Sequence, residues 1–247
     1  MPDLFDMRLR AVRRNRASRG SQGQFLLERA FDDCFERIQL LERRFERALL
    51  IGCSDVTWPK RLRELADAVD AFAPEMIEDR WEPPAGIYDL VLAIGTLDTV
   101  NDLPLALRLV RHSMKAGGLF IGAFSGGDTL PVLRAAMRAA DSVAGGAAPH
   151  VHPRIEASAI APLLEQAGWV KPVVDVDRVR VSYRSLTQLI TDLRAMAAAN
   201  ILVARPRFMT KAARAAAMNA FAGAGDGERT TETFEIVHFA AWSAGEA

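Results

Sequence analysis

The stretch Gly117-Gly118-Leu119-Phe120-Ile121-Gly122-Ala123-Phe124 is an apolar strand that a glycine turn introduces. It stops at Ser125-Gly126-Gly127-Asp128-Thr129-Leu130-Pro131, where two glycines precede a helix-start signal. Upstream, residues 87–94 form a second apolar run that ends at Gly95-Thr96, and the helical pattern of residues 103–114 joins the two strands. This βαβ unit directs the search for function to the carboxyl ends of both strands, because ligands of open α/β sheets bind there.

The composition fits a globular protein with a core of its own. The chain has 247 residues, of which half are hydrophobic, and a formal net charge of zero, so nucleic acid is not expected as a partner. Residues 1–20 nevertheless hold six arginines against two aspartates. This basic N-terminal arm could contact phosphates, an acidic partner or a membrane surface, or it could fold over the domain as an amphipathic arm.

The sequence also bears on the compartment. Cys34 and Cys53 are the only cysteines, which favours a reducing, cytoplasmic setting over a disulfide framework. No run approaches the roughly 20 apolar residues of a membrane span, and the basic start lacks the apolar region of a secretory signal. The arginines resemble those of a mitochondrial transit peptide, against which Asp3 and Asp6 argue.

Hydrophobic periodicity predicts alternating strands and helices. We expect helices at 24–47, 59–69, 103–114, 129–144, 156–167, 185–199 and 206–222. We expect strands at 48–53, 87–94, 119–124, 173–183 and 233–242, with short candidates at 68–73 and 75–77. The alternation predicts an α/β fold whose mostly parallel sheet has helices on both faces, with the last strand inserted as an antiparallel edge neighbour.

This order of elements resembles the class I S-adenosylmethionine-dependent methyltransferase fold, which implies a Rossmann-like sheet. Val100-Asn101-Asp102-Leu103-Pro104, the stretch from Phe120 to Leu130, and Pro149-His150-Val151-His152-Pro153 resemble a narrower family. These are the mitochondrial complex I assembly factors of the arginine-hydroxylase type and their bacterial relatives, and more distantly the malonyl-carrier-protein methyltransferases. Leu4-Phe5-Asp6 and the stretch from Asp175 to Tyr183 extend the likeness, which implies S-adenosylmethionine as a candidate cofactor.

The cofactor loop departs from that family. In the family, the first strand ends in an acidic residue followed by alternating glycines, which let the main chain approach the cofactor. Here Leu50-Ile51-Gly52-Cys53-Ser54-Asp55-Val56 keeps Gly52 alone, and Leu49 or Leu50 occupies the acidic position. We therefore expect S-adenosylmethionine binding to be weakened or lost.

Tyr88 lies 36 residues after Gly52. A second strand, a crossover helix and a third strand need roughly 6, 12 and 6 residues, besides about 12 for the first helix and further residues for its loops, so the segment is short for all of them. One crossover is therefore expected to be a loop, near residues 72–75. In the family this region holds the carboxylate for the cofactor ribose, for which Asp70 is the candidate, and the adenine wall, where Asp79 could lie. The candidate cofactor-binding residues are Gly52, Cys53, Asp70, Asp79, Gly95 and Thr96.

Other residues carry a functional and a structural interpretation. Asp128 or Thr129 can cap a helix, and Gly126 and Gly127 can allow close approach of a substrate. His150 and His152 could form half of a metal site, a hydrogen-bonding or pH-sensing pair, or a helix-entry turn, and we predict no metal. The candidate substrate or partner residues are Gly126, Gly127, Asp128, His150, His152, Tyr183 and Asn200.

Three remaining features narrow the chemistry. Cys53 is a small buried side chain or a reactive thiolate, and His238 alternates with apolar residues as a core histidine. Asp98 and Thr99 stand where the resembled family carries His and Trp, so this chain lacks an imidazole that could have been catalytic. No catalytic residue is identified, and no Ser/His/Asp triad, P-loop or CxxC motif is present.

Three functions follow as hypotheses. The favoured one is a methyltransferase-fold protein of the assembly-factor type that has weakened or lost S-adenosylmethionine binding and acts on or binds a protein partner. The alternative is an active S-adenosylmethionine-dependent methyltransferase on a small molecule or protein. The third, which the resemblance suggests, is arginine hydroxylation, for which the sequence displays no iron facial triad. We expect a basic arm and helix at 1–47 and a methyltransferase-like domain at 48–247, with a helical cover at about 185–222.

Overall fold

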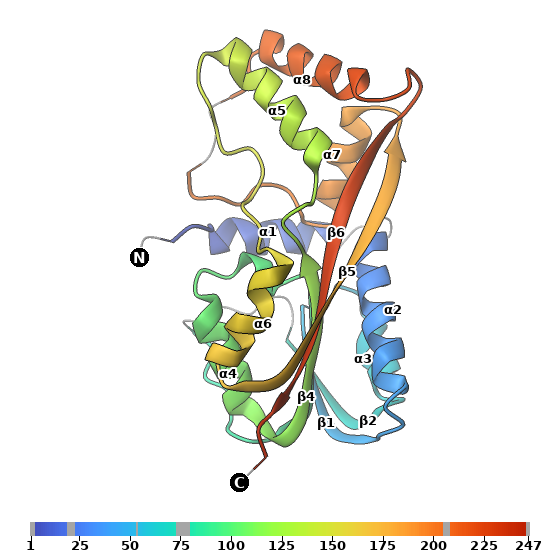
Figure 1. Ribbon diagram of the computed structural model, residues 1–247, viewed down its shortest axis with the longest axis vertical. Helices are drawn as coiled ribbons and strands as arrows, with labels where there is room; N and C mark the ends of the chain where they lie inside the picture. Colours follow the sequence, from blue (N-terminus) through green and yellow to red (C-terminus); the bar gives the residue numbers. More distant parts are fainter. Residues whose placement is uncertain (1–2, 19–22, 53, 73–79, 205–207, 246–247) are drawn as a thin grey trace. The chain divides into compact units, whose positions relative to one another are not determined.

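The computed structural model describes residues 3–18, 23–52, 54–72, 80–204 and 208–245 (Figure 1). The helices are α1 Met7–Ala17, α2 Phe25–Gln39, α3 Trp58–Leu62, the 3₁₀ helix η1 Leu97–Thr99, α4 Leu103–Ser113, α5 Pro131–Ala144, α6 Ala157–Gln166, α7 Leu186–Ala195 and α8 Lys211–Gly223. The strands are β1 Phe45–Ile51, β2 Ala66–Phe72, β3 Tyr88–Ile94, β4 Met114–Ser125, β5 Trp169–Tyr183 and β6 Thr230–Ser243.

The strands form one mixed sheet in the order β2-β1-β3-β4-β6-β5. Strands β1 to β4 pair in parallel, and β6 pairs antiparallel to β4. The predicted α/β class, with a mostly parallel sheet and an antiparallel last strand, is confirmed. The predicted edge position of that strand is wrong, because β6 lies between β4 and β5 and leaves β5 at the edge.

The chain divides into two compact units, each described by itself below. The first, here called the sheet unit, comprises Gln24–Gly126, Ile155–Asp177 and Ile236–Ala247. The second, here called the helical unit, comprises Met1–Gly23, Gly127–Arg154 and Arg178–Glu235. The division at residue 48 and the cover at 185–222 that we expect from the sequence stay predictions.

In the sheet unit, helices cover both faces of the strands: α4 and α6 lie on one face, and α2 and α3 on the other (Figure 1). The α4 face buries an aromatic cluster in which the Phe120 ring lies 4.7 Å from that of Trp169 and 4.9 Å from that of Phe239. On the α2 face, Phe31 stacks on Trp58 at 4.5 Å. Burial of these rings is the main force that holds the layers together.

The boundaries near β1 and β2 differ from those predicted. Helix α2 ends at Gln39 rather than residue 47, and α3 ends at Leu62 rather than residue 69. In both places the apolar residues that continue the helical spacing belong to a strand, since Phe45 pairs with Ala66. Likewise β4 begins at Met114 rather than at residue 119, so Gly117 and Gly118 lie within the strand and are not a turn that precedes it.

The crossover between β2 and β3, where we expect a loop near residues 72–75, is described only in part. Residues 80–87 contain neither helix nor strand, and the short strand candidate at 75–77 lies outside the described residues.

In the helical unit, α5 packs against α8, and α1 packs against α7 (Figure 1). The described part of the basic arm, residues 3–18, therefore contains a folded helix: Arg10 is buried, and the Arg13 guanidinium donates to the backbone carbonyl of Asn200. Among the described residues, no helix is both long and apolar enough to cross a membrane.

Helix α5 begins differently from the prediction. Its cap residue is Leu130, in a left-handed conformation and without a side-chain cap, instead of Asp128 or Thr129. The Glu232 carboxylate on β6 accepts hydrogen bonds from the backbone N–H groups of Val132 (3.2 Å) and Leu133 (2.7 Å). The Thr129 hydroxyl is engaged with the β6 backbone, so a distant glutamate supplies the cap.

Candidate functional site

The carboxyl ends of β1 and β3 meet in the sheet unit, as expected for parallel neighbours. Gly52 and Gly95 follow these strands with φ angles of 81° and 59°. A Cβ atom on Gly52 would lie 2.2 Å from the Ile94 carbonyl oxygen, and one on Gly95 would lie 2.6 Å from Leu27 Cδ2. The space that glycine keeps open at both positions is therefore used by the chain's own packing.

Thr96 belongs to the same group, because its Cβ lies 3.4 Å from the place of a Cβ on Gly52. It is fully buried, and its carbonyl accepts a hydrogen bond from the Thr99 hydroxyl at 3.2 Å. The structure thus brings together the predicted cofactor residues Gly52, Gly95 and Thr96. Two other predicted cofactor residues, Cys53 and Asp79, lie outside the described residues. The last one, Asp70, is described next.

Asp70 on β2 has partners within the sheet. Its carboxylate accepts hydrogen bonds from Arg47 Nε (2.8 Å) and from the Tyr88 hydroxyl (3.1 Å). The bond from Arg47 lowers the pKa of the Asp70 carboxyl, while burial and the Asp70 carboxylate raise the pKa of Tyr88 to about 12. The two partners stand early in β1 and β3, so the carboxylate is directed away from the ends marked by Gly52 and Gly95.

In the helical unit, the two histidines of the His-Val-His motif have separate partners. His150 Nε2 lies 2.8 Å from an Asp141 carboxylate oxygen. His152 Nε2 accepts a hydrogen bond from the Ile201 N–H at 2.7 Å, and the His152 carbonyl accepts one from Arg134. Asn200 joins this cluster, since its side-chain amide donates to the Pro149 carbonyl. The local hydrogen-bonding interpretation of the motif fits this arrangement.

The remaining candidates have other partners. The Asp128 carboxylate is 3.2 Å from Arg178, which also lies 3.1 Å from the buried Glu235 carboxylate. Tyr183 is buried with its ring 6.5 Å from that of Phe234, and burial together with Asp192 raises the pKa of its hydroxyl. In the sheet unit, Gly126 forms an isolated bridge with Ile155.

His152 provides a test of this cluster by pH. Burial first, and then the charges of Arg154 and Arg13, lower the pKa of His152 to about 3. The unfolded imidazole binds a proton near its ordinary pKa of about 6.5, so the unfolded state takes up more protons between these values and stability falls as the pH falls. We expect this histidine alone to lower the free energy of unfolding by about 2 kcal/mol between pH 7 and pH 5.

The measurement compares urea unfolding of the wild type and of His152→Gln at both pH values. The variant should lose that part of the pH dependence, whatever its stability at pH 7. His112→Gln, at an exposed histidine, is the control and should keep the wild-type dependence. An unchanged pH dependence in His152→Gln would show that this imidazole is not held neutral.

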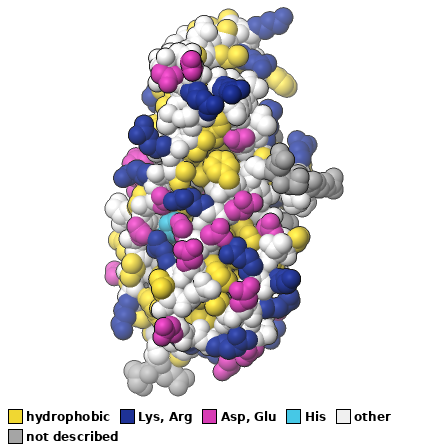
Figure 2. All heavy atoms as spheres, turned by 90° about the vertical axis from the view of Figure 1, so that its right-hand side faces the viewer, with side chains coloured by type: hydrophobic (Ala, Val, Ile, Leu, Met, Phe, Trp, Pro, Cys, Tyr) yellow, Lys and Arg dark blue, Asp and Glu magenta, His cyan; other side chains and the backbone are white. Residues whose placement is uncertain are grey.

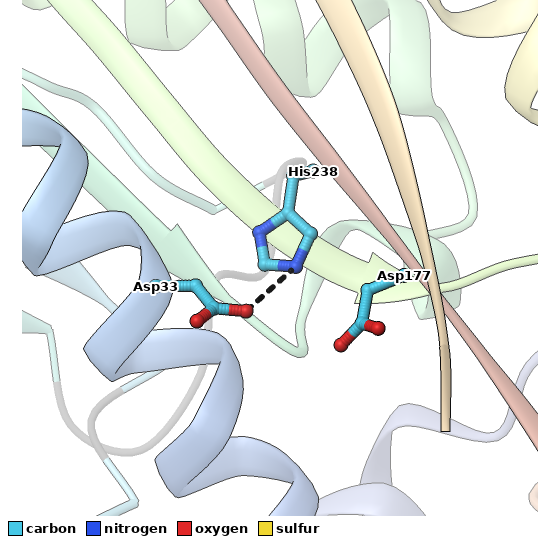
Figure 3. Close-up of side chains that lie close together, drawn as sticks. All are labelled: Asp33, Asp177 and His238. Atoms are coloured by element: carbon cyan, nitrogen blue, oxygen red, sulfur yellow. Dashed lines mark ion pairs between the residues drawn. The ribbon is translucent and has the colours of Figure 1, made fainter. Parts of the chain in front are cut away.

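Sequence reasoning missed one group of side chains in the sheet unit. Asp33 on α2, Asp177 on β5 and His238 on β6 point toward one another (Figure 3), and their ligand atoms all lie within 4.8 Å of one another. The predicted burial of His238 is confirmed, with 1% of its surface exposed. No local signal could have found the group, because Asp177 lies 144 residues after Asp33 and His238 lies a further 61 residues along the chain.

The surface near this group is charged. Figure 2 shows one face of the molecule, on which acidic and basic side chains are interspersed. Two ion pairs link α2 to β5, with Arg29 and Arg37 each 2.6 Å from the carboxylates of Asp177 and Asp175 respectively. Exposed pairs of this kind contribute little to stability, but they fix the positions of the carboxylates.

The sheet order and the helices on both faces define the class I S-adenosylmethionine-dependent methyltransferase fold. The YcgJ protein of Bacillus subtilis superposes with a TM-score of 0.54 at 12% identity, over 85% of this chain and 97% of that one. The N-methyltransferase NodS of Bradyrhizobium japonicum, solved with S-adenosyl-L-homocysteine, gives 0.50 at 12% identity, over 95% and 98%. At such low identity these likenesses show the fold alone.

The sequence relatives are more specific. Arginine-hydroxylase NDUFAF5 of Rattus norvegicus is 28% identical over 97% of this chain and 77% of its own length. The Danio rerio protein of the same name is 36% identical over 63% and 49%. The malonyl-[acyl-carrier protein] O-methyltransferase of Nitrosospira multiformis is 33% identical over 62% and 48%. The chain thus spans about half to three quarters of the length of these relatives.

No protein-family profile matches the chain. The resemblance to the class I methyltransferase superfamily, to the arginine-hydroxylase type of assembly factor and to the malonyl-carrier-protein methyltransferases is nevertheless confirmed by these relatives and by the fold.

Proposed function

We propose that this chain is a methyltransferase-fold protein of the assembly-factor type that binds or acts on a protein partner and has weakened or lost S-adenosylmethionine binding. The observation that carries the proposal is the packing at the ends of β1 and β3. A glycine in a nucleotide-binding loop leaves bare main chain for the ligand, whereas Gly52 leaves room for the Ile94 carbonyl and Gly95 for the Leu27 side chain.

A second observation concerns charge. The cofactor carries an ammonium group and a ribose, which carboxylates bind in enzymes of this fold. Leu49 and Leu50, which stand at the expected acidic position, are buried in the sheet. Asp70, the candidate for the ribose, is already paired with Arg47 and Tyr88. Neither anchor is therefore presented to a cofactor by the described residues.

The helical unit supports the partner half of the proposal. A cavity of about 370 Å³ lies between the end of α5 and the start of α8, and Phe208 and Met209 help to line it. Phe208 is fully exposed and Met209 is 39% exposed. Exposed apolar side chains beside a cavity are typical of a surface that another molecule covers. The relatives named as NDUFAF5 and as malonyl-[acyl-carrier protein] methyltransferases favour a protein-borne substrate or partner.

The alternative is an active S-adenosylmethionine-dependent methyltransferase on a small molecule or protein. It is favoured by the juxtaposition of Gly52, Gly95 and Thr96 at the carboxyl edge of the sheet, the edge at which ligands of this architecture bind. Methyl transfer requires mainly that donor and acceptor be aligned, so this alternative needs no catalytic base.

Thermal unfolding with added S-adenosylmethionine and S-adenosylhomocysteine separates the two functions. A ligand at 100 times its Kd adds about 2.7 kcal/mol to the free energy of unfolding. We expect no saturable shift in Tm with either compound up to 1 mM, whereas NodS, run alongside, should show one. Saturable stabilisation of this chain at micromolar ligand would overturn the proposal in favour of the active enzyme.

A further inference from the structure

Three side chains from distant parts of the sheet unit meet at one point. Asp33 comes from α2, Asp177 from β5 and His238 from β6, and Figure 3 shows the imidazole lying between the two carboxylates. The histidine is 1% exposed, whereas the side chains of Asp33 and Asp177 are 32% and 28% exposed. The group therefore has a buried nitrogen at its base and two carboxylates toward solvent.

Direct hydrogen bonding does not account for this arrangement. Among the described residues, His238 Nε2 is buried without a hydrogen-bond partner, and the nearest carboxylate oxygen, on Asp33, lies 3.6 Å away. That separation exceeds the usual length of an N–H···O bond. A buried polar nitrogen without a partner is costly, so a group that fills the space between the nitrogen and the carboxylates would stabilise the fold.

The separation fits two ligands of one metal ion. An ion that holds nitrogen and oxygen ligands at about 2.0–2.2 Å keeps neighbouring ligand atoms about 3–3.6 Å apart. We propose that Asp33, Asp177 and His238 bind one divalent transition-metal ion, with His238 Nε2 and one oxygen from each carboxylate as ligands. Imidazole together with carboxylate is a donor set that Zn²⁺, Mn²⁺ and Fe²⁺ accept.

The surroundings of the three ligands match those of metal sites. A metal-binding histidine directs its other ring nitrogen to a neighbouring group, and His238 Nδ1 lies 3.7 Å from Cys34 Sγ. The Cys34 sulfur is buried on the Nδ1 side of the imidazole, whereas Nε2 is the nitrogen that faces the Asp33 carboxylate. The Asp177 carboxylate accepts from Arg29 at 2.6 Å through one oxygen, which leaves the other for the ion.

Charge balance also favours a divalent ion. Asp33, Asp175 and Asp177 carry three negative charges against the two positive charges of Arg29 and Arg37, so this region presents a net negative charge to a cation. The ion would tie α2 to β5 and β6. Three protein ligands leave at least one coordination position for water or a substrate atom.

The test uses the full chain freed of metal by a chelator. Isothermal titration with Zn²⁺ and with Mn²⁺ should give one site per chain for at least one of the two ions, accompanied by a rise in Tm. We expect Asp177→Asn and His238→Gln each to weaken binding by at least tenfold. Failure of the wild type to bind either ion at a stoichiometry of one would overturn the proposal.

The matched control is Asp175→Asn. Asp175 lies on β5 two residues from Asp177 and pairs with an α2 arginine in the same way, but it is not one of the three ligands. This variant should bind metal within threefold of the wild type, and an equal loss in both aspartate variants would contradict the assignment. Because His238→Gln could fail to fold, Co²⁺ absorption in the visible provides a second measurement: bands that Asp177→Asn abolishes support the site, and bands that it leaves unchanged overturn it.

Discussion

Replacing Gly52 by alanine is expected to lower the free energy of unfolding by about 2–5 kcal/mol. The added Cβ would lie 2.2 Å from the Ile94 carbonyl oxygen, and the φ angle of 81° disfavours any side chain. The Ile94 oxygen belongs to the end of β3 and cannot move without disturbing its pairing with β4. Chemical denaturation of the wild type and the variant measures the difference.

Gly86→Ala is the control for backbone strain alone. Gly86 has a φ angle of 60°, but nothing lies within 4 Å of the place that a Cβ would take. This variant should lose only about 1–2 kcal/mol, so the difference between the two variants isolates the contact with Ile94. Equal losses would show that Gly52 is required only for its conformation, and that the approach to the Ile94 carbonyl adds no further cost.

The result bears on how the loop after β1 is interpreted. A single glycine in a cofactor-loop position can be retained for the ligand or for the fold, and sequence cannot separate these causes. The close approach that a Cβ on Gly52 would make to the Ile94 carbonyl favours a role in the fold, and so does that of a Cβ on Gly95, after β3, to the Leu27 side chain. Glycine at both positions is therefore compatible with weakened cofactor binding, because the packing alone would require it.

The sequence predicts the centre of the sheet well. Strand β3 and the apolar part of β4 are uninterrupted hydrophobic runs, as expected for parallel strands covered on both faces, and α4 between them shows helical spacing. The boundaries of α2 and α3 were wrong because Phe45 and Val69 continue a helical spacing but pair as strand residues. Pairing between strands is a tertiary interaction that a local pattern does not contain.

The only part of the candidate site that the sequence predicts is the part that follows from the parallel pairing of neighbouring strands. Parallel neighbours end at the same edge, which places Gly52 beside Thr96. The group of Asp33, Asp177 and His238 depends instead on how α2 lies against β5 and β6, and the cap of α5 depends on Glu232 from β6. Neither the group of three side chains nor the Glu232 cap can be predicted from the spacing of residues along the chain.

Truncating Phe120 to alanine is expected to lower the free energy of unfolding by about 3–5 kcal/mol. Phe120 is fully buried in β4, where its ring packs on Trp169 from β5 and on Phe239 from β6. Removal of the ring leaves a cavity that these two rigid side chains cannot fill. The variant therefore loses the free energy gained by burying the ring and also bears the cost of the cavity. Urea unfolding provides the midpoint and the slope, and a shifted midpoint at constant slope is the expected outcome.

Phe208→Ala, the same substitution at a fully exposed residue, is the control and should change stability by less than about 0.5 kcal/mol. The comparison matters because Phe120 joins the parallel strands to the edge formed by β6 and β5, which carry two of the three proposed metal ligands. A loss below about 1 kcal/mol at Phe120 would mean that this edge is not packed on β4 as described. The geometry of Asp177 and His238 would then lack the rigid support that a metal site requires.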